Sequence, residues 1–304
     1  MNSAIADEAQ RKAAVSPYLQ LTVLVFAAGV IYPLLYLRQN FEVSMLETFN
    51  ITNSQLGECY SMLGVLFTLT YLPSGWLADR VSPRKLLSFS LAMTGLLGIW
   101  YWTIPSFGAL QVIFAGWGVT TGLTFWAALI KETTLIAGEN RQGRFFGVLE
   151  GGRGVVEATL ASLAVAGFAW AVSNMDATTP QALRHVILMY VVVLLAMAPI
   201  VYLTISESDD SPRAEKEETG HGTFRNTMML LGNEQIWLCA ICIFAGYTLF
   251  YSTYSFAGFL QTEMSLSAVM VGWITVGRLW MRPIGGVLAG FIADRWHVER
   301  VLVV

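Results

Sequence analysis

The chain has 304 residues, of which 55% are hydrophobic and only 13% are charged, and its formal net charge is −3. A soluble domain carries about 25% charged residues, so this composition indicates an integral membrane protein. The acidic surplus lies in one polar segment, residues 207–218, and does not suggest a nucleic-acid partner. No pattern for a nucleophile with its base, a metal-ligand cluster or a phosphate loop is present. We therefore expect neither an enzyme nor a bound cofactor or metal.

Apolar segments separated by short polar turns predict eight membrane-spanning helices. The first begins at Ser16-Pro17, a cap followed by proline at the first helical position. Its apolar face continues past Arg38, which places this arginine inside the bilayer. Thr52 and Gln55 have the spacing of a capping box that starts the second helix. The helices are expected at about 18–49, 53–78, 86–103, 109–136, 145–172, 186–205, 235–260 and, after a cap at Ser267, up to residue 293.

These helices predict an all-α membrane protein with two bundles. Residues 1–205 form an N-terminal six-helix bundle, and the polar segment 206–225 is a cytoplasmic linker. Residues 226–304 begin a C-terminal bundle, with helices seven and eight and the opening of a ninth at 301–304.

Basic residues set the orientation of these spans. Most turns that carry them fall on one side of the membrane under this helix count, namely those at residues 11–12, 80–85, 141–144 and 295–300. That side is expected to be cytoplasmic and to hold the N-terminus. The N-terminal segment has no cleavable apolar core, so we expect a multi-pass protein of the inner (plasma) membrane.

One hexapeptide pattern occurs twice. Gly75-Trp76-Leu77-Ala78-Asp79-Arg80 closes the second helix, and Gly290-Phe291-Ile292-Ala293-Asp294-Arg295 closes the eighth. A glycine allows two helices to approach closely, and an aspartate beside an arginine can lock them by a charge-assisted hydrogen bond. We interpret both copies as latches that open and close the transport path. The candidate gating residues are Gly75, Asp79, Arg80, Arg84, Gly290, Asp294 and Arg295.

Ionisable residues inside membrane helices are costly and therefore indicate function. Nine fall inside the predicted spans or close to their ends: Arg38, Glu58, Lys131, Glu132, Glu150, Arg153, Glu157, Arg278 and Arg282. Glu150, Arg153 and Glu157 have the spacing i, i+3, i+7, which places them on one face of the fifth helix.

Four of these residues also have a structural interpretation. Glu150 and Glu157 can form a buried ion pair between helices. Arg282 precedes Pro283 and can cap the carbonyls that a helix irregularity frees, while Lys131 can extend its amine to the interface. Four aromatic residues either line a cavity or simply pack, namely Tyr36, Trp126, Tyr247 and Tyr251.

The duplicated Gly-x-x-x-Asp-Arg pattern resembles the loop between helices 2 and 3 of the major facilitator superfamily, which recurs between helices 8 and 9. The resemblance covers the whole chain and implies two six-helix bundles around a central site. By this symmetry four further helices follow Asp294. We expect residues 1–304 to be incomplete as a transporter, with Arg278 and Arg282 exposed to lipid.

A narrower resemblance rests on helices 1, 2 and 5. Arg38-Gln39-Asn40-Phe41 and Asp79-Arg80-Val81-Ser82-Pro83-Arg84 are similar to stretches of the organophosphate:phosphate antiporter family. That family binds the substrate phosphate through the arginine that corresponds to Arg38. Its helix 5 aligns with residues 147–154 and puts Arg153 where a substrate-facing histidine is usual.

The sequence departs from that family at two positions. Leu35 holds the place of a usual tyrosine, with Tyr36 one residue closer to Arg38. Phe250 holds the place of a second phosphate-binding arginine on helix 7. Because the second phosphate-binding arginine is absent, a sugar acid, carboxylate or sulfonate is as plausible a substrate as a phosphate ester.

The function expected from these features is secondary transport of a small organic anion by alternating access. The anion binds to Arg38, Arg153 and Arg282, near Tyr36 and Tyr251. Glu150 or Glu157 carries a coupling proton, and both proton symport and anion exchange with a counter-anion remain open. The alternative is a transporter-like membrane sensor of a small anion. The expected partners are the substrate, the coupling ion and the lipid bilayer, and the protein is expected to be a monomer.

Overall fold

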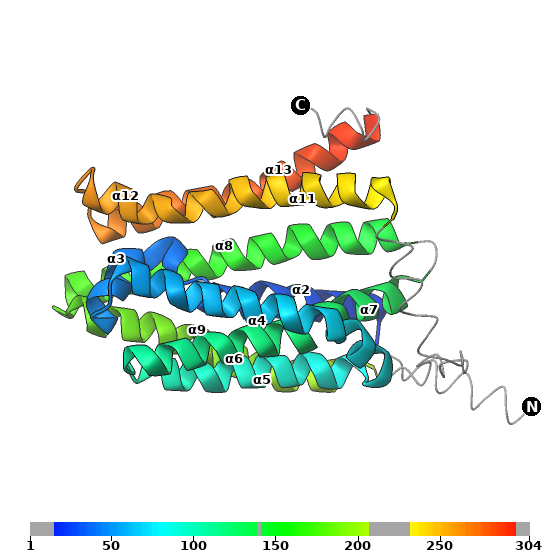
Figure 1. The fold of residues 1–304 in the computed structure, drawn as a ribbon, viewed down its shortest axis with the longest axis horizontal. Helices are drawn as coiled ribbons and strands as arrows, with labels where there is room; N and C mark the ends of the chain where they lie inside the picture. The colour runs from blue at the N-terminus through cyan, green and yellow to red at the C-terminus, as the bar shows by residue number, and fades with distance from the viewer. Residues whose placement is uncertain (1–14, 139–140, 207–231, 296–304) are drawn as a thin grey trace, which may run out of the picture.

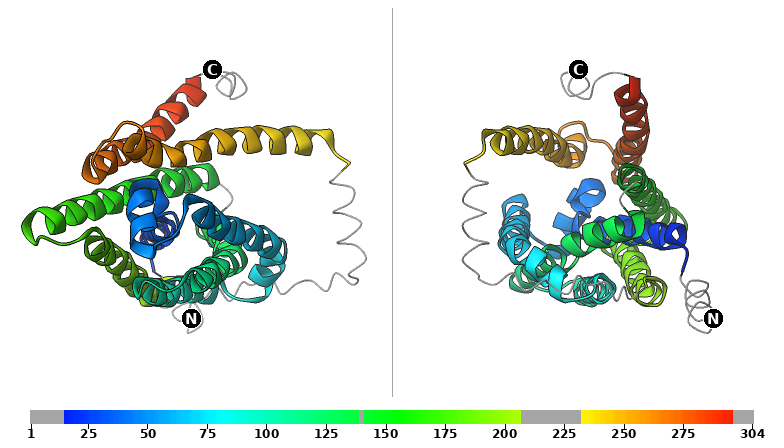
Figure 2. Two further views of the ribbon diagram at one scale, coloured as in Figure 1. Left: turned by 60° about the vertical axis from the view of Figure 1, so that its left-hand side comes forward. Right: turned by 90° about the vertical axis from the view of Figure 1, so that its right-hand side faces the viewer.

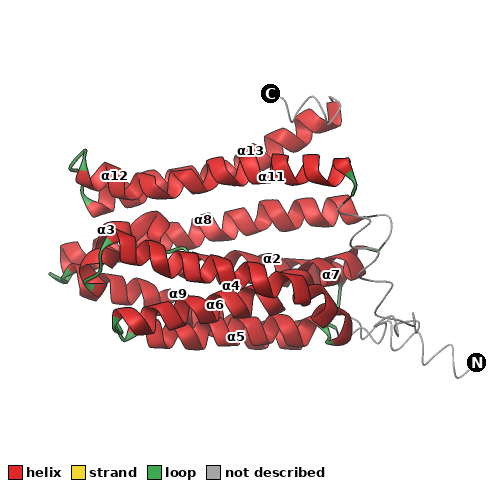
Figure 3. Ribbon diagram, viewed as in Figure 1, coloured by secondary structure: helices red, strands yellow, loops and turns green. Residues whose placement is uncertain are grey.

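The computed structural model of this chain describes residues 15–138, 141–206 and 232–295. Regular structure in these residues is entirely helical, with no strand among them (Figure 3). The predicted all-α fold is therefore confirmed. By length and composition, five segments of the described chain can cross a membrane: Pro17–Phe49, Asn53–Arg80, Phe107–Ala137, Gln142–Asn174 and Thr179–Thr204.

The helices run roughly parallel or antiparallel to one long axis (Figure 1). Their bounds are α2 Pro17–Leu35, α3 Arg38–Phe49, α4 Asn53–Arg80, α5 Pro83–Trp102, α6 Phe107–Thr124, α7 Trp126–Ala137, α8 Gln142–Asn174, α9 Thr179–Thr204, α11 Glu234–Ser252, η1 Thr253–Ser255, α12 Phe256–Thr262 and α13 Ala268–Arg295. We call the end where α3 meets α4 the Asn50 end, and the end where α4 meets α5 the Asp79 end.

The predicted first helix is interrupted just before Arg38. Pro33 lies inside α2 and lacks the N–H that would continue the helical ladder. The helix ends two residues later, at Leu35, and α3 begins at Arg38 with a further kink at Phe41, where φ is −132°. Arg38 therefore lies at the start of a helix rather than in the middle of one.

Two other predicted helices are also divided. The fourth breaks at Phe125, after threonine side chains that bond back to the helix. Thr121 and Thr124 each donate to the carbonyl four residues earlier, at 2.6 Å, and such bonds bend helices. The seventh breaks at the polar run Thr253–Ser255, which forms a 3₁₀ turn.

Several helix starts follow the capping chemistry of the sequence, but Ser16, the predicted cap of α2, makes no capping hydrogen bond through its side chain within the described residues. Thr52 and Gln55 form the predicted capping box, with hydrogen bonds of 2.9 and 3.2 Å. Ser267 accepts from the Met270 N–H at 3.3 Å and caps α13, as predicted. The sixth helix starts earlier than expected, at Thr179. There the Gln181 side chain accepts from the Thr178 N–H.

Helices α2 to α9 form the N-terminal bundle, whose interior is mostly apolar and also contains a few charged side chains, among them Glu42, Glu132 and Arg153. The closest packing joins α4 to α6, α5 to α9 and α2 to α8. Glycine makes the first of these contacts possible: a Cβ at Gly118 of α6 would lie 2.5 Å from the Leu63 carbonyl oxygen of α4. Any side chain at Gly118 would therefore push the two helices apart.

Helices α11, α12 and α13 lie together on one side of that bundle (Figures 1 and 2). Helix α13 packs against α8, while α12 and α13 both contact α3 near the Asn50 end. Helix α11 makes its main contacts with η1, and all of its described side chains are exposed. The halves therefore meet through α3, α8, α12 and α13.

Some predicted features fall beyond the described residues. Residues 207–225 of the predicted linker lie outside the described chain. The predicted opening of a ninth helix at 301–304 lies outside it as well. The N-terminal bundle is described from residue 15 onward.

Candidate functional site

A cavity of about 810 Å³ lies between the N-terminal bundle and the C-terminal helices. Its wall comes from α2, α3, α4, α7 and α8 on one side and from α11, η1 and α13 on the other. The five residues predicted to bind substrate all line it, namely Arg38, Arg153, Arg282, Tyr36 and Tyr251. Segments far apart in the sequence thus converge on one space.

Aromatic side chains form much of the cavity wall. Nine of the 18 lining residues are aromatic: Tyr32, Tyr36, Tyr60, Phe67, Tyr71, Trp126, Tyr247, Tyr251 and Tyr254. The Tyr36 ring stacks on Tyr60 at 6.1 Å and lies 6.2 Å from Tyr251 and 5.8 Å from Tyr254. These rings and hydroxyls suit a ligand with an apolar or ring-shaped body and polar substituents.

The predicted charged face of α8 is present, and α13 completes it. Arg153 Nε lies 3.3 Å from Oε2 of Glu150, one turn away. Arg282 of α13 places Nη1 3.1 Å from Oε2 of Glu157 and Nη2 3.7 Å from Oε2 of Glu150. The Pro283 and Arg282 side chains pack directly over this face, since a Cβ built on Gly154 would be in ordinary van der Waals contact with them at 3.5–3.8 Å.

Arg153 is the most deeply buried of the three cavity arginines. It is only 9% exposed, and its guanidinium lies 5.0 Å from the centre of the Trp126 ring. Its Nη1 makes no hydrogen bond to any described residue. A buried guanidinium N–H without an acceptor is unfavourable, so a ligand oxygen at this position would be stabilising.

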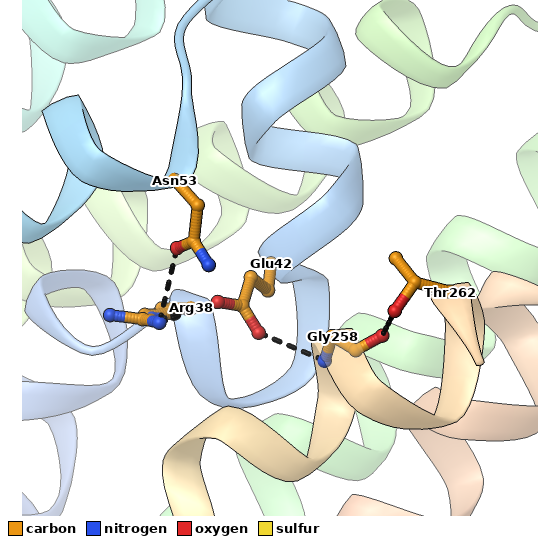
Figure 4. A network of polar contacts seen from close by, with 5 residues as sticks. All are labelled: Arg38, Glu42, Asn53, Gly258 and Thr262. Atoms are coloured by element: carbon orange, nitrogen blue, oxygen red, sulfur yellow. Dashed lines mark hydrogen bonds and ion pairs between the residues drawn. The ribbon is translucent and has the colours of Figure 1, made fainter.

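Arg38 is held by a carboxylate that the sequence analysis did not single out. Its Nε donates to Oε1 of Glu42 at 2.9 Å, and its Nη2 lies 2.6 Å from the same oxygen (Figure 4). Nη2 also donates to Oδ1 of Asn53 at 3.2 Å. Oε2 of Glu42 accepts from the Gly258 N–H of α12 at 2.8 Å.

Glu42 is 2% exposed and belongs with the buried charges. A usable signal for it was its position four residues after Arg38, because such pairs face each other on a helix. Gln39 was missed too. Its Oε1 accepts from Arg278 of α13 at 3.0 Å, and Arg278 also donates to Thr253.

The expectation that Arg278 and Arg282 face lipid in this chain is wrong. Arg278 bonds to α3 and η1, and Arg282 lines the cavity beside Glu157. Both arginines therefore contact protein because α13 packs directly against α8 and α3.

The latch residues at the Asp79 end differ from the expected arrangement. Asp79 is 77% exposed and lies 3.9 Å from the Lys131 amine, which also donates to the Ala78 carbonyl at 2.7 Å. Arg80 instead lies over the Trp76 ring at 4.1 Å and donates to its carbonyl. Consecutive helix residues point in different directions, so Asp79 and Arg80 do not pair with each other.

Of the remaining latch residues, Gly75 and Arg84 are described, whereas the side chains of the second copy are not. No atom lies within 4 Å of a Cβ built on Gly75, so this glycine makes no close helix contact in the described chain. Arg84 lies 4.0 Å from the centre of the Tyr202 ring. Gly290, Asp294 and Arg295 belong to the final turns of α13, where the side chains lie outside the described part, as does that of Phe250.

The arrangement as a whole offers guanidinium donors to an anion while keeping the site nearly neutral. Each cavity arginine lies beside a glutamate: Arg38 by Glu42, Arg153 by Glu150, and Arg282 by Glu157. Buried charges of this kind, inside a bundle of helices long enough to cross a membrane, define the class as a multi-pass membrane protein with charged side chains in a central cavity.

The family model agrees with this class. The model described as Major Facilitator Superfamily matches residues 18–304, and the chain belongs to that family. The five segments that can cross a membrane agree with a multi-pass membrane protein of this family.

Two relatives of this chain are inner membrane proteins of Escherichia coli. The chain is 30% identical to the Escherichia coli inner membrane protein YihN over 276 residues, which cover 90% of the chain and 64% of that relative. It is 28% identical to the E. coli inner membrane protein YqcE over 280 residues, covering 90% of the chain and 65% of the relative. The chain thus spans slightly under two thirds of the length of these relatives.

Proposed function

We propose that the chain is part of a secondary transporter that carries a small organic anion across the inner membrane by alternating access, with a cytoplasmic N-terminus. The substrate class comprises organophosphates, sugar acids, carboxylates and sulfonates. The inner-membrane location is supported by the names of the two E. coli relatives. The similarity of residues 38–41 and 79–84 to the organophosphate:phosphate antiporters supports an anionic substrate.

One observation carries this proposal: the guanidinium of Arg153, which is 9% exposed and has an Nη1 without a hydrogen-bond partner in the described chain. It shares the cavity wall with Arg38 and Arg282. Guanidinium groups bind carboxylate, phosphate and sulfonate oxygens in a planar fork. The aromatic wall would hold the organic part of the same molecule.

The charge balance supports coupled transport. The three cavity arginines and their three glutamates sum to zero formal charge when all are ionised. A monoanion entering alone would leave a net negative charge in a poorly solvated space, which is unfavourable. A proton bound by Glu157 or Glu150, or the departure of another anion, removes that charge. Glu157 is the better candidate because its side chain is 13% exposed, against 51% for Glu150.

The experiment starts with ligand-induced thermal stabilisation of the purified full-length protein. Phosphate esters, sugar acids and sulfonates are screened, and the best ligand is then tested for uptake into proteoliposomes. We expect saturable uptake, with the Arg153→Gln variant binding about 10- to 100-fold more weakly, as expected for the loss of one charged hydrogen-bonding group.

Arg184→Gln is the matched control. Arg184 also lies over a tryptophan, at 5.2 Å from Trp102, but it lines no part of the cavity. Equal losses in the two variants would contradict the proposed site. Specific binding without uptake would instead favour a membrane sensor of the same anion.

A further inference from the structure

The Glu42 carboxylate joins the cavity to the C-terminal helices with its two oxygens. Oε1 receives both hydrogen-bonding nitrogens of Arg38, a cavity residue. Oε2 receives the backbone N–H of Gly258, in α12 (Figure 4). One side chain thus connects the substrate-facing arginine of the N-terminal bundle to a helix of the other half.

Burial makes the two contacts interdependent. Glu42 is 2% exposed, so a charged carboxylate at this position requires its hydrogen-bond donors. Loss of Arg38 would leave a buried negative charge supported by a single amide. A charge in that state is expected to leave its buried position, which breaks the contact with α12.

The fit between Glu42 and α12 depends on glycine at position 258. A Cβ there would lie 2.5 Å from Oε2 and 3.0 Å from the carboxyl carbon of Glu42. Any other residue would displace the carboxylate. The same end of the molecule is also closed by the Arg278 contacts with Gln39 and Thr253.

We propose that Glu42 is a positioning residue that holds the Asn50 end closed while Arg38 is available to it, and that an anion binding to Arg38 weakens this closure. An anion that takes the Nε and Nη2 edge of Arg38 replaces Oε1 of Glu42. The carboxylate then loses its charged partner and releases the Gly258 amide. The role of the anion rests on the proposed function, whereas the link from Glu42 to α12 does not.

Closure at the Asn50 end can be measured without any ligand. Spin labels are attached to cysteines at Glu47 of α3 and at Glu263 just after α12, both exposed positions. The native cysteines 59, 239 and 242 are replaced by alanine, and the full-length protein is studied in lipid nanodiscs. Pulsed electron paramagnetic resonance then gives the distribution of distances between α3 and α12.

We expect Glu42→Ala and Gly258→Ala to increase the long-distance population. Gly258→Ala keeps glutamate at position 42 but displaces its carboxylate from α12, and it serves if Glu42→Ala fails to fold. Gly246→Ala is the matched control, because a Cβ there meets no atom within 4 Å. An unchanged distribution in both Glu42→Ala and Gly258→Ala would overturn the proposal.

The link through Arg38 has its own test. Arg38→Gln should open the Asn50 end because it leaves the buried Glu42 carboxylate without its cationic partner. The double variant Arg38→Gln with Glu42→Gln should close it again, since a neutral amide can still accept from the Gly258 N–H. An end that stays open in the double variant would contradict the charge argument, even if the cavity binds no anion.

Discussion

At the scale of single residues, the main feature is that every cavity arginine lies beside a glutamate. Arg38 and Arg153 were identified from the sequence because an ionisable group in a membrane helix is costly. Their partners were harder to find. Arg282 reaches Glu157 only because α13 folds back against α8, a contact that the spacing of the residues cannot reveal.

Arg38→Lys should weaken binding of the best ligand about tenfold, which corresponds to about 1.4 kcal/mol. Lysine keeps the positive charge but lacks the planar fork that now bonds Glu42 and Asn53. Isothermal titration calorimetry on the full-length protein measures the change, with Arg184→Lys as the control. An unchanged affinity in Arg38→Lys would remove Arg38 from the anion site.

At the scale of helices, the sequence predicted the order and approximate bounds of all eight segments. Capping patterns at Thr52 and Ser267 were read correctly because they depend on local chemistry. The breaks at residues 36–37, 125 and 253–255 were not predicted, because apolar residues continue at helical spacing on both sides of each break. Pro33 was the visible signal for the first break.

The contact between α4 and α6 provides a stability prediction. Gly118→Ala should destabilise the protein by about 1–3 kcal/mol, since the new methyl group meets backbone atoms of Leu63 that have no room to move. Leu63 also lines the cavity, so ligand binding should weaken as well. Gly108→Ala in the same helix is the control, because its Cβ meets nothing within 4 Å. Thermal unfolding in detergent compares the two variants.

The Asp79 end provides a prediction about rates. Asp79→Asn should slow transport several-fold while leaving equilibrium ligand affinity unchanged, because Asp79 lies at the far end of α4 and interacts with Lys131 rather than with the cavity. Uptake kinetics and calorimetry on the same preparation separate the two quantities. A parallel loss of affinity and rate would show that Asp79 acts on the site and not on conformational exchange.

At the scale of the whole molecule, the cavity is built from both halves of the fold. The charge pattern of α8 was predicted. Four aromatic residues that were named as candidates for the cavity wall do line it, namely Tyr36, Trp126, Tyr247 and Tyr251. The contribution of Tyr32, Tyr60 and Tyr254 was not predicted, because these tyrosines lie on three different elements. Only their packing in three dimensions brings them together.

Glu157→Gln should abolish the pH dependence of anion binding. With Glu157 ionised, a monoanion makes the cavity net negative, so binding takes up a proton and strengthens as pH falls. Glutamine removes that requirement and should give tighter binding that does not vary with pH. The charged and titratable groups around Glu157 are unchanged in the variant, namely Arg153, Arg278, Arg282, Glu150, Tyr190 and Tyr254.

The measurement is ligand affinity at several pH values between about 5.5 and about 8. Glu150→Gln is the control, because its side chain is 51% exposed and water can solvate its charge. If Glu157→Gln binds with the same pH slope as the unmodified protein, another group carries the coupling proton.

The pairing of each cavity arginine with its own glutamate has a consequence for how such transporters diversify. A glutamate codon becomes a glutamine codon by one nucleotide change. Such a change at position 42, 150 or 157 raises the net charge of the cavity by one without altering an arginine. With the proposed proton on Glu157, a change at position 42 or 150 gives a cavity that suits a dianion, whereas a change at position 157 gives one that suits a monoanion without a proton. Natural variation at these three positions is therefore expected to follow both substrate charge and proton coupling.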